Sequence, residues 1–218
     1  MRVIPWPPGW VRNTLGAVDD VFSGIVERFL LASTGFERRL RTVRPEQWAR
    51  PTPCAEWDVR LLVNHMTRGN LNYAALAKGG TAAEFARMRS VDALGDDPVG
   101  AFERSVRECA DAYTAPGVLE AVLDFPLGPA QGKQALAVRT ADAVVHTWDL
   151  ARALGADEAL DPGLVGWIDA NMDVIYAGLA ETPVAAATSH RFFAPSPAGP
   201  AAQTAQDRLL RRTGRDPS

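Results

Sequence analysis

Residues 142–155, Asp-Ala-Val-Val-His-Thr-Trp-Asp-Leu-Ala-Arg-Ala-Leu-Gly, combine an apolar helical pattern with two side chains that can hold a cation. Asp142 and His146 are four residues apart, so on a helix they share one face, with their Cβ atoms about 5–6 Å apart. Both could then reach one metal ion about 2 Å from each donor atom. Val144 and Val145 make the surroundings apolar, and a cation stabilises a buried imidazole beside a buried carboxylate. A surface ion pair or a hydrogen-bonded core histidine is the alternative that the spacing alone allows.

The hydrophobic pattern predicts further helices on both sides of this segment, because apolar residues recur every three or four positions. The expected helices cover residues 14–43, 58–78, 98–113, 134–154 and 162–179, with a short one at 206–212. The pair Gly79-Gly80 can end the second of these helices, and Pro162 fits the first turn of the fifth. The first helix could be interrupted near residues 33–35, Ser-Thr-Gly.

The segments between these helices are rich in proline and glycine. Three prolines predict a loop at residues 44–56, and the pattern at 119–133 is typical of an extended excursion. The chain shows no alternation of strand with helix and no repeat. Four major helices with one long crossover therefore predict an all-α, up-down four-helix bundle. We expect a single domain over residues 1–218, with its core at about 14–181 and a C-terminal strap and short helix at 182–218.

The composition is that of a globular protein, and it argues against several classes of partner. The 218 residues are 47% hydrophobic and 22% charged, with a formal net charge of −3. No cluster of Lys and Arg predicts a nucleic-acid interface. No uncharged apolar run approaches the ~20 residues that a membrane span needs, and prolines near the N-terminus do not fit a signal peptide. We therefore expect a soluble, cytoplasmic monomer or homodimer that binds neither nucleic acid nor a membrane.

Two of the three histidines are candidates for one site. His65 lies on the predicted helix 58–78, and it could supply a third metal ligand if that helix faces the helix of Asp142 and His146. His190 lies in an irregular segment without a partner at ligand spacing, so we interpret it as structural or exposed.

Two charged residues near these histidines could take part in catalysis. Asp149 follows His146 by three residues, so it could accept a hydrogen bond from the second ring nitrogen of a ligand histidine and orient it. An ordinary ion pair of Asp149 with Arg152 or Arg139 is the alternative. Arg68 lies one turn after His65, where it could meet an anionic substrate or be a solvated surface arginine.

Two aromatic residues and one cysteine lie beside the candidate ligands. Trp57 and Trp148 could line a pocket at the metal, or they could pack within the bundle. Cys54 lies just before the helix 58–78, whose positive end could activate its thiol; a packing role is the alternative. With Cys109 as the only other cysteine, we expect reduced thiols rather than a disulfide framework.

Two segments resemble the signature sequences of the DinB-like superfamily. They are residues 51–65, Pro-Thr-Pro-Cys-Ala-Glu-Trp-Asp-Val-Arg-Leu-Leu-Val-Asn-His, and residues 142–155. Together with the tail, where Gln-Asp-Arg-Leu-Leu at 206–210 precedes Thr-Gly-Arg-Asp-Pro at 213–217, they resemble an actinobacterial branch of that superfamily. This branch includes the N-terminal domain of mycothiol-dependent maleylpyruvate isomerase. The resemblance extends from about Gly16 to the C-terminus.

The resemblance implies a four-helix bundle that holds one divalent metal, zinc or nickel. Its ligands would be His65 from the second helix and Asp142 and His146 from a later one. Members of the family often have His or Glu at the position of Asp142, so the shorter Asp departs from their pattern and could bind through water. Asp149 and Cys54 also match positions of the family pattern.

The resemblance further implies a metal-dependent thiol S-transferase. A low-molecular-weight thiol, mycothiol, would bind the metal as a thiolate and add to a small electrophilic substrate. In this hypothesis Asp149 and Arg68 are catalytic, and Trp57 and Trp148 hold the cosubstrate. Two alternatives remain open at the level of sequence: a metal-dependent hydrolase or isomerase that activates water, and a non-catalytic ligand-binding or self-resistance protein.

Overall fold

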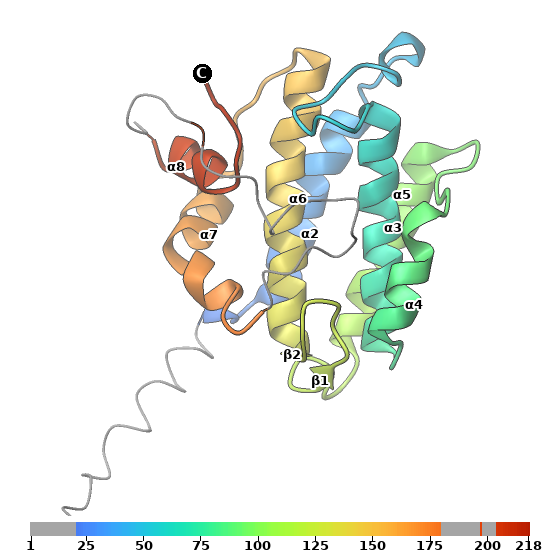
Figure 1. The fold of residues 1–218 in the computed structure, drawn as a ribbon, viewed down its shortest axis with the longest axis vertical. Helices are drawn as coiled ribbons and strands as arrows, with labels where there is room; N and C mark the ends of the chain where they lie inside the picture. The colour runs from blue at the N-terminus through green and yellow to red at the C-terminus, as the bar shows by residue number, and fades with distance from the viewer. Residues whose placement is uncertain (1–20, 180–196, 198–203) are drawn as a thin grey trace, which may run out of the picture.

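Four long helices form a bundle in the computed structural model, which describes residues 21–179, 197 and 204–218 (Figure 1). They are α2 (Ile25–Leu40), α3 (Val59–Ala77), α5 (Pro98–Thr114) and α6 (Gly132–Leu154). Helix α6 packs against α2 and α3, and α5 packs against the same two helices from the other side. The expected all-α bundle is confirmed. His190 and most of the expected strap lie outside the described residues.

The direction of the helices follows from ion pairs near their ends. Arg41, just after α2, pairs with Glu103 near the start of α5, so these two helices run in opposite directions. Lys78, just after α3, pairs with Glu108 in the second half of α5, so α3 and α5 run in the same direction. Helix α6 runs opposite to α3, because His65 near the start of α3 lies at Asp142 and the later Asn70 lies at the earlier Arg139.

The crossover that makes α3 and α5 parallel is the segment 78–97. It contains α4 (Ala82–Arg87) and the 3-10 helix η2 (Met88–Ser90), neither of which the sequence pattern predicts. The segment runs back along α3: Asn72 donates to the Phe85 carbonyl, and the Ala93 N–H donates to Asn64. The expected excursion at 119–133 is a short antiparallel hairpin of β1 (Val122–Leu123) and β2 (Ala130–Gln131), which leads into α6.

Helix α2 is continuous through residues 33–35, so an interruption at that point is wrong. Gly35 faces α6, and an added Cβ would lie 3.8 Å from the Thr147 side chain. Ser33 is buried as well. Both residues thus lie inside a continuous, packed helix, and an alanine at position 35 would make only an ordinary van der Waals contact with α6. The change of backbone direction lies earlier, at Gly24, which takes a left-handed conformation (φ 65°) before the helix begins.

Helix ends follow the expected capping chemistry. The Asp58 carboxylate accepts from the Leu61 N–H at 2.8 Å at the start of α3, and Asp161 caps α7 (Pro162–Ile175) in the same way. Gly155 ends α6 in the left-handed conformation. Helix α7 is shorter than the expected range 162–179. The expected C-terminal helix is α8 (Ala205–Arg212), which packs on α7 and buries Leu209 and Leu210.

Helix α6 lies at the centre of this arrangement, with α7 and α8 beyond it (Figure 1). Besides apolar residues, it buries three groups that can be charged, namely Arg139, His146 and Asp149. Such groups are seldom buried unless they are paired or bind a ligand, so α6 is the place to look for a functional site. Among the described residues, no helix is both long enough and apolar enough to cross a bilayer.

Candidate metal centre

The antiparallel packing of α3 against α6 brings His65, Asp142 and His146 together. The Nε2 atom of His65 lies 3.3 Å from Asp142 Oδ2, and His146 Nε2 lies 3.1 Å from Asp142 Oδ1. Potential ligand atoms of the three residues all lie within 4.8 Å of one another. Two ligands of a tetrahedral zinc ion are about 3.4 Å apart when each is about 2.1 Å from the metal. Two nitrogen donors and one oxygen donor at this spacing fit a divalent ion, and the short Asp142 side chain reaches both imidazoles.

The imidazole of His146 is held from behind by Asp149. The distance from His146 Nδ1 to Asp149 Oδ2 is 2.8 Å, and both side chains are buried. A carboxylate accepts hydrogen bonds, so Nδ1 carries a proton towards Asp149, and Nε2, which faces His65 and Asp142, is the nitrogen that would bind an ion after losing its own proton. Metal-binding histidines commonly have such a partner on the second nitrogen. Asp149 therefore lies where a ligand-orienting carboxylate should lie.

Asp142 has a second anchor in Arg139, whose side chain is only 1% exposed. The guanidinium donates to Asp142 Oδ2, to the Asn70 side chain at 2.8 Å and to the Met66 carbonyl at 2.6 Å. Gly69 makes room for it, because a Cβ there would lie 2.8 Å from Arg139 Nη1. The sequence interpretation overlooked this role of Arg139. A glycine inside a helix, four residues after a candidate ligand, was the available signal.

The charges of the metal-free cluster depend on these contacts. Burial lowers the pKa of His65 to about 4, although Asp142 opposes this effect. Burial also disfavours the charged form of His146, but the Asp142 and Asp149 carboxylates together outweigh burial and raise the pKa of His146 well above its ordinary value. For Asp142 the two histidines likewise overcome burial and hold its pKa well below the usual range. Without metal, His65 is neutral and His146 carries a proton that an ion would have to displace.

Trp57 covers both histidines. Its ring centroid lies 4.6 Å from that of His65 and 5.7 Å from that of His146. The ring is fixed by its own loop, in which the Trp57 carbonyl accepts from both the backbone N–H and the hydroxyl of Thr52. The same loop places Cys54 Sγ 3.4 Å from Asp149 Oδ2, on the far side of His146.

Trp148 and Arg68 have different neighbours from Trp57. Trp148 lies under the guanidinium of Arg152, at 4.6 Å, and lines a surface pocket of about 730 Å³ together with Arg215. Arg68 is partly buried on α3, and its pKa is lowered first by burial and then by the neighbouring Arg89. The alternative, in which Asp149 pairs with Arg152 or Arg139, is wrong: Arg152 pairs with Glu158, and Asp149 pairs with Arg215.

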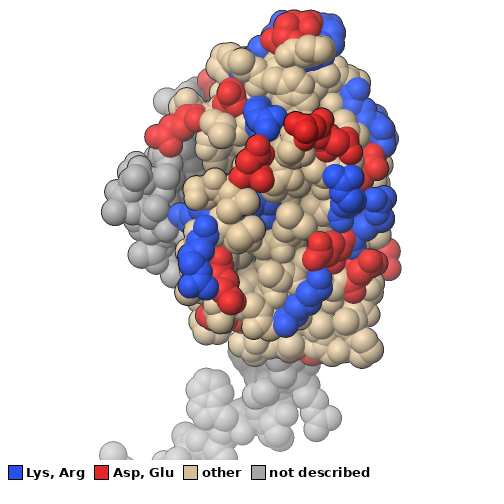
Figure 2. Space-filling view, turned by 90° about the vertical axis from the view of Figure 1, so that its right-hand side faces the viewer, with Lys and Arg blue, Asp and Glu red and all other residues tan. Residues whose placement is uncertain are grey.

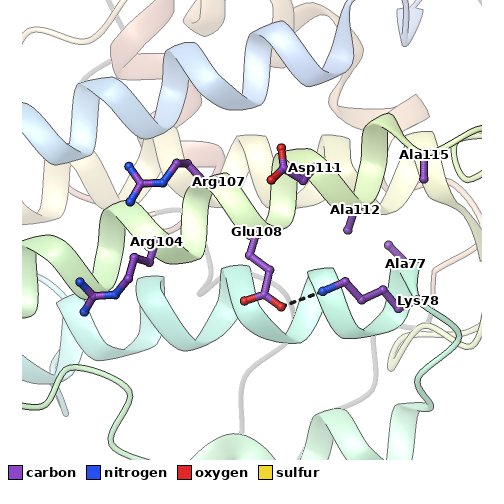
Figure 3. Close-up of a pocket in the computed structure, with 8 residues that line it drawn as sticks. All are labelled: Ala77, Lys78, Arg104, Arg107, Glu108, Asp111, Ala112 and Ala115. Atoms are coloured by element: carbon purple, nitrogen blue, oxygen red, sulfur yellow. Dashed lines mark hydrogen bonds and ion pairs between the residues drawn. The ribbon is translucent and has the colours of Figure 1, made fainter.

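A second hollow lies between α3 and α5, on a face where acidic and basic side chains are interspersed (Figure 2). Its volume is about 650 Å³, and the Lys78–Glu108 ion pair crosses it (Figure 3). Lys78 is more than three turns beyond His65, about 20 Å along α3. This hollow is remote from the cluster of His65, Asp142 and His146, and the charged groups in it lie at the surface.

Comparison with known proteins identifies the family of this chain. Residues 29–151 match the family model described as the mycothiol maleylpyruvate isomerase N-terminal domain. The uncharacterized protein Rv0738 of Mycobacterium tuberculosis (strain ATCC 25618 / H37Rv) is 33% identical over 133 residues, which cover 61% of this chain and 69% of that protein. The uncharacterized protein MT0763 of strain CDC 1551 / Oshkosh gives the same values.

Two solved structures share the fold. The crystal structure of the mycothiol-dependent maleylpyruvate isomerase matches with a TM-score of 0.55 at 15% identity, over 69% of each chain. A histidine-to-alanine mutant of that enzyme matches equally well. At this level of identity the likeness extends to the fold alone.

Proposed function

Since the chain belongs to the family of the mycothiol maleylpyruvate isomerase N-terminal domain, we propose that it is a metal-dependent thiol S-transferase. Its metal ligands are His65, Asp142 and His146. Its cosubstrate is a low-molecular-weight thiol, mycothiol, and its second substrate is a small electrophile. The observation that carries the proposal is the convergence of three donor atoms within 4.8 Å, with a buried carboxylate behind one of them.

The donor set suits zinc, and nickel is the alternative metal. Zinc in catalytic sites commonly has three protein ligands drawn from His, Asp and Glu and keeps one position open. A bound dication would supply the positive charge that favours the thiolate form of a thiol at neutral pH. Such a metal site needs three protein ligands. The three side chains that converge here come from two helices, α3 and α6.

The remaining residues would bind and orient the substrates. Trp57 excludes water from one side of the two histidines and offers an apolar surface to the thiol. Asp149 holds the lone pair of His146 in the direction of the metal. The partly buried Arg68 lies near Arg89, and together they favour a substrate that carries negative charge.

A transfer assay tests this proposal. Zinc-loaded protein should accelerate the reaction of mycothiol with a fluorogenic alkylating electrophile such as monochlorobimane. His65→Ala should lower the rate by more than about 100-fold, because even the partners behind metal ligands are typically worth about 10- to 100-fold. The matched control is Lys78→Ala, at the remote hollow, which should keep the full rate.

Three results would contradict the transferase function. Equal rates with and without metal would show that the transfer reaction does not require the metal. Hydrolysis of ester or amide probes that needs no thiol would favour activation of water. Tight retention of mycothiol without turnover would favour a ligand-binding protein.

Metal binding should weaken as the pH falls, because the ion and a proton compete for His146. In the metal-free protein the Asp142 and Asp149 carboxylates together outweigh burial and raise the pKa of His146, so below that pKa one proton leaves for each metal bound. The apparent affinity should then fall by about tenfold for each pH unit. Zinc titration against a chromophoric chelator between about pH 8 and pH 6 measures this slope. An affinity that does not change over this interval would show that the ion displaces no proton from His146.

A further inference from the structure

The carboxylate of Asp149 is fully buried and has three partners. Oδ2 accepts from His146 Nδ1 at 2.8 Å and lies 3.4 Å from Cys54 Sγ. The third partner is Arg215, which donates through Nη2 to Oδ2 at 2.8 Å and through Nε to Oδ1 at 3.3 Å. Arg215 therefore binds both oxygens of the carboxylate, the two-point geometry in which arginine is most directional.

Arg215 comes from the end of the chain, beyond α8 and beyond the residues that match the family model. Further contacts hold this tail against α6. Arg152 on α6 donates to the carbonyls of Pro217 and Ser218, and Arg215 donates to the Thr213 carbonyl at 2.6 Å. The Arg215 side chain is only 15% exposed. The guanidinium thus reaches Asp149 from an anchored segment.

The two-point contact limits how the carboxylate can turn. A buried carboxylate bonded only to an imidazole can rotate about its Cβ–Cγ bond, and the imidazole can follow it. With both oxygens fixed by Arg215, Oδ2 stays directed at His146 Nδ1. The plane of the imidazole is then set, and Nε2 points to Asp142 at 3.1 Å. Burial disfavours the charge on Arg215, but the Asp149 carboxylate outweighs it and keeps the guanidinium charged.

We propose that Arg215 is a positioning residue of the metal centre: the C-terminal tail holds Asp149 and, through it, orients His146 for the metal. The inference rests on the proposed metal site. It adds to that site a residue from outside the bundle. Docking of the tail and binding of the metal then favour each other, because each stabilises the same orientation of His146.

Metal affinity in a double-mutant cycle tests the inference. Arg215→Ala should weaken zinc binding by about tenfold, the usual size of an effect on the partner of a metal ligand. In the Asp149→Ala background the same change should have no further effect, because the group through which it acts is gone. Arg208→Ala is the matched control, since Arg208 lies on α8 and pairs with Asp169 instead. Arg215→Lys should recover only part of the affinity, because lysine cannot make the two-point contact.

A second readout reports on the tail without metal. Arg215 Nη2 lies 3.5 Å from Cys54 Sγ, whereas Cys109 is fully buried. At about pH 10, where an ordinary thiol is ionised with or without a neighbouring cation, Arg215→Ala should uncover Cys54 and speed its alkylation by iodoacetamide, with Cys109 as the protected internal reference. Circular dichroism establishes that each variant is folded.

The outcomes separate the two proposals. Wild-type protein that binds no zinc overturns the metal site and this inference with it. Wild-type protein that binds zinc, beside an Arg215→Ala variant of equal affinity, overturns the inference alone. Equal losses in the Asp149→Ala and wild-type backgrounds would show that Arg215 acts by some other route.

Discussion

Replacement of His146 by alanine is expected to remove the metal from this protein. Wild-type protein, purified without a histidine tag, should contain about one equivalent of zinc or nickel by elemental mass spectrometry. His146 supplies one of the three converging donors, and it is the one whose position Asp149 fixes. The variant should therefore bind zinc more than about 100-fold more weakly, since partners of metal ligands alone are typically worth about 10- to 100-fold.

Two changes at Asp142 provide the controls for this experiment. Asp142→Glu keeps an oxygen donor of longer reach and should keep the metal. Asp142→Ala removes the donor that lies between the two imidazoles and should lose it. A His146→Ala variant that retains a full equivalent of metal would place the ion elsewhere. A wild-type protein that stays metal-free after zinc is added would leave the ligand-binding function as the better interpretation.

Replacement of Arg139 by alanine is expected to destabilise the metal-free protein by about 2–4 kcal/mol, because buried acceptors lose their donor, while the partly exposed Asp142 keeps His146 as a partner. The buried guanidinium satisfies Asp142, the Asn70 side chain and the Met66 carbonyl. Without it, these acceptors lose a donor and a cavity remains. Urea denaturation measures the change as a shift of the midpoint. Arg38→Ala is the control, because Arg38 is exposed on α2; the change should alter stability by less than about 0.5 kcal/mol.

Gly69 provides a second test of the same contact. A Cβ at this position would lie 2.8 Å from Arg139 Nη1, so Gly69→Ala should destabilise the wild-type protein by about 1–3 kcal/mol. In the Arg139→Ala background the added methyl group meets no guanidinium, and its effect should be smaller. Additive effects of the two changes, or an Arg139→Ala variant with the wild-type midpoint, would contradict this account of the buried arginine.

Helix positions were predictable because they depend on local pattern. Apolar periodicity places α3, α5, α6 and α8 close to their observed limits. The prediction was wrong near residues 33–35, where small residues were interpreted as a break. A small residue has two uses, a flexible backbone and close packing, and the choice depends on the neighbouring helix. At Gly35 that neighbour is Thr147 of α6.

Spacing on one helix identified Asp142 and His146 as candidate ligands. It did not identify the residues that lie beside them in the folded chain. Asp142 and His146 share a face of α6 whatever the fold, because four residues are about one helical turn. That His65 opposes them depends on the register of α3 against α6, which a helical pattern does not specify. The role of Arg139 depends on the same register, because Gly69 must lie opposite it.

The partner of Asp149 shows most clearly which contacts a local sequence pattern cannot predict. Spacing along α6 offered Arg152 and Arg139, and both have other partners. The observed partner, Arg215, is 66 residues away in the tail. Periodicity and capping determine helices because their energies depend on residues a few positions apart. A buried charge instead selects whichever opposite charge the folded chain brings within hydrogen-bond distance, so only the tertiary structure decided that the C-terminal tail reaches Asp149, beside the candidate metal ligands.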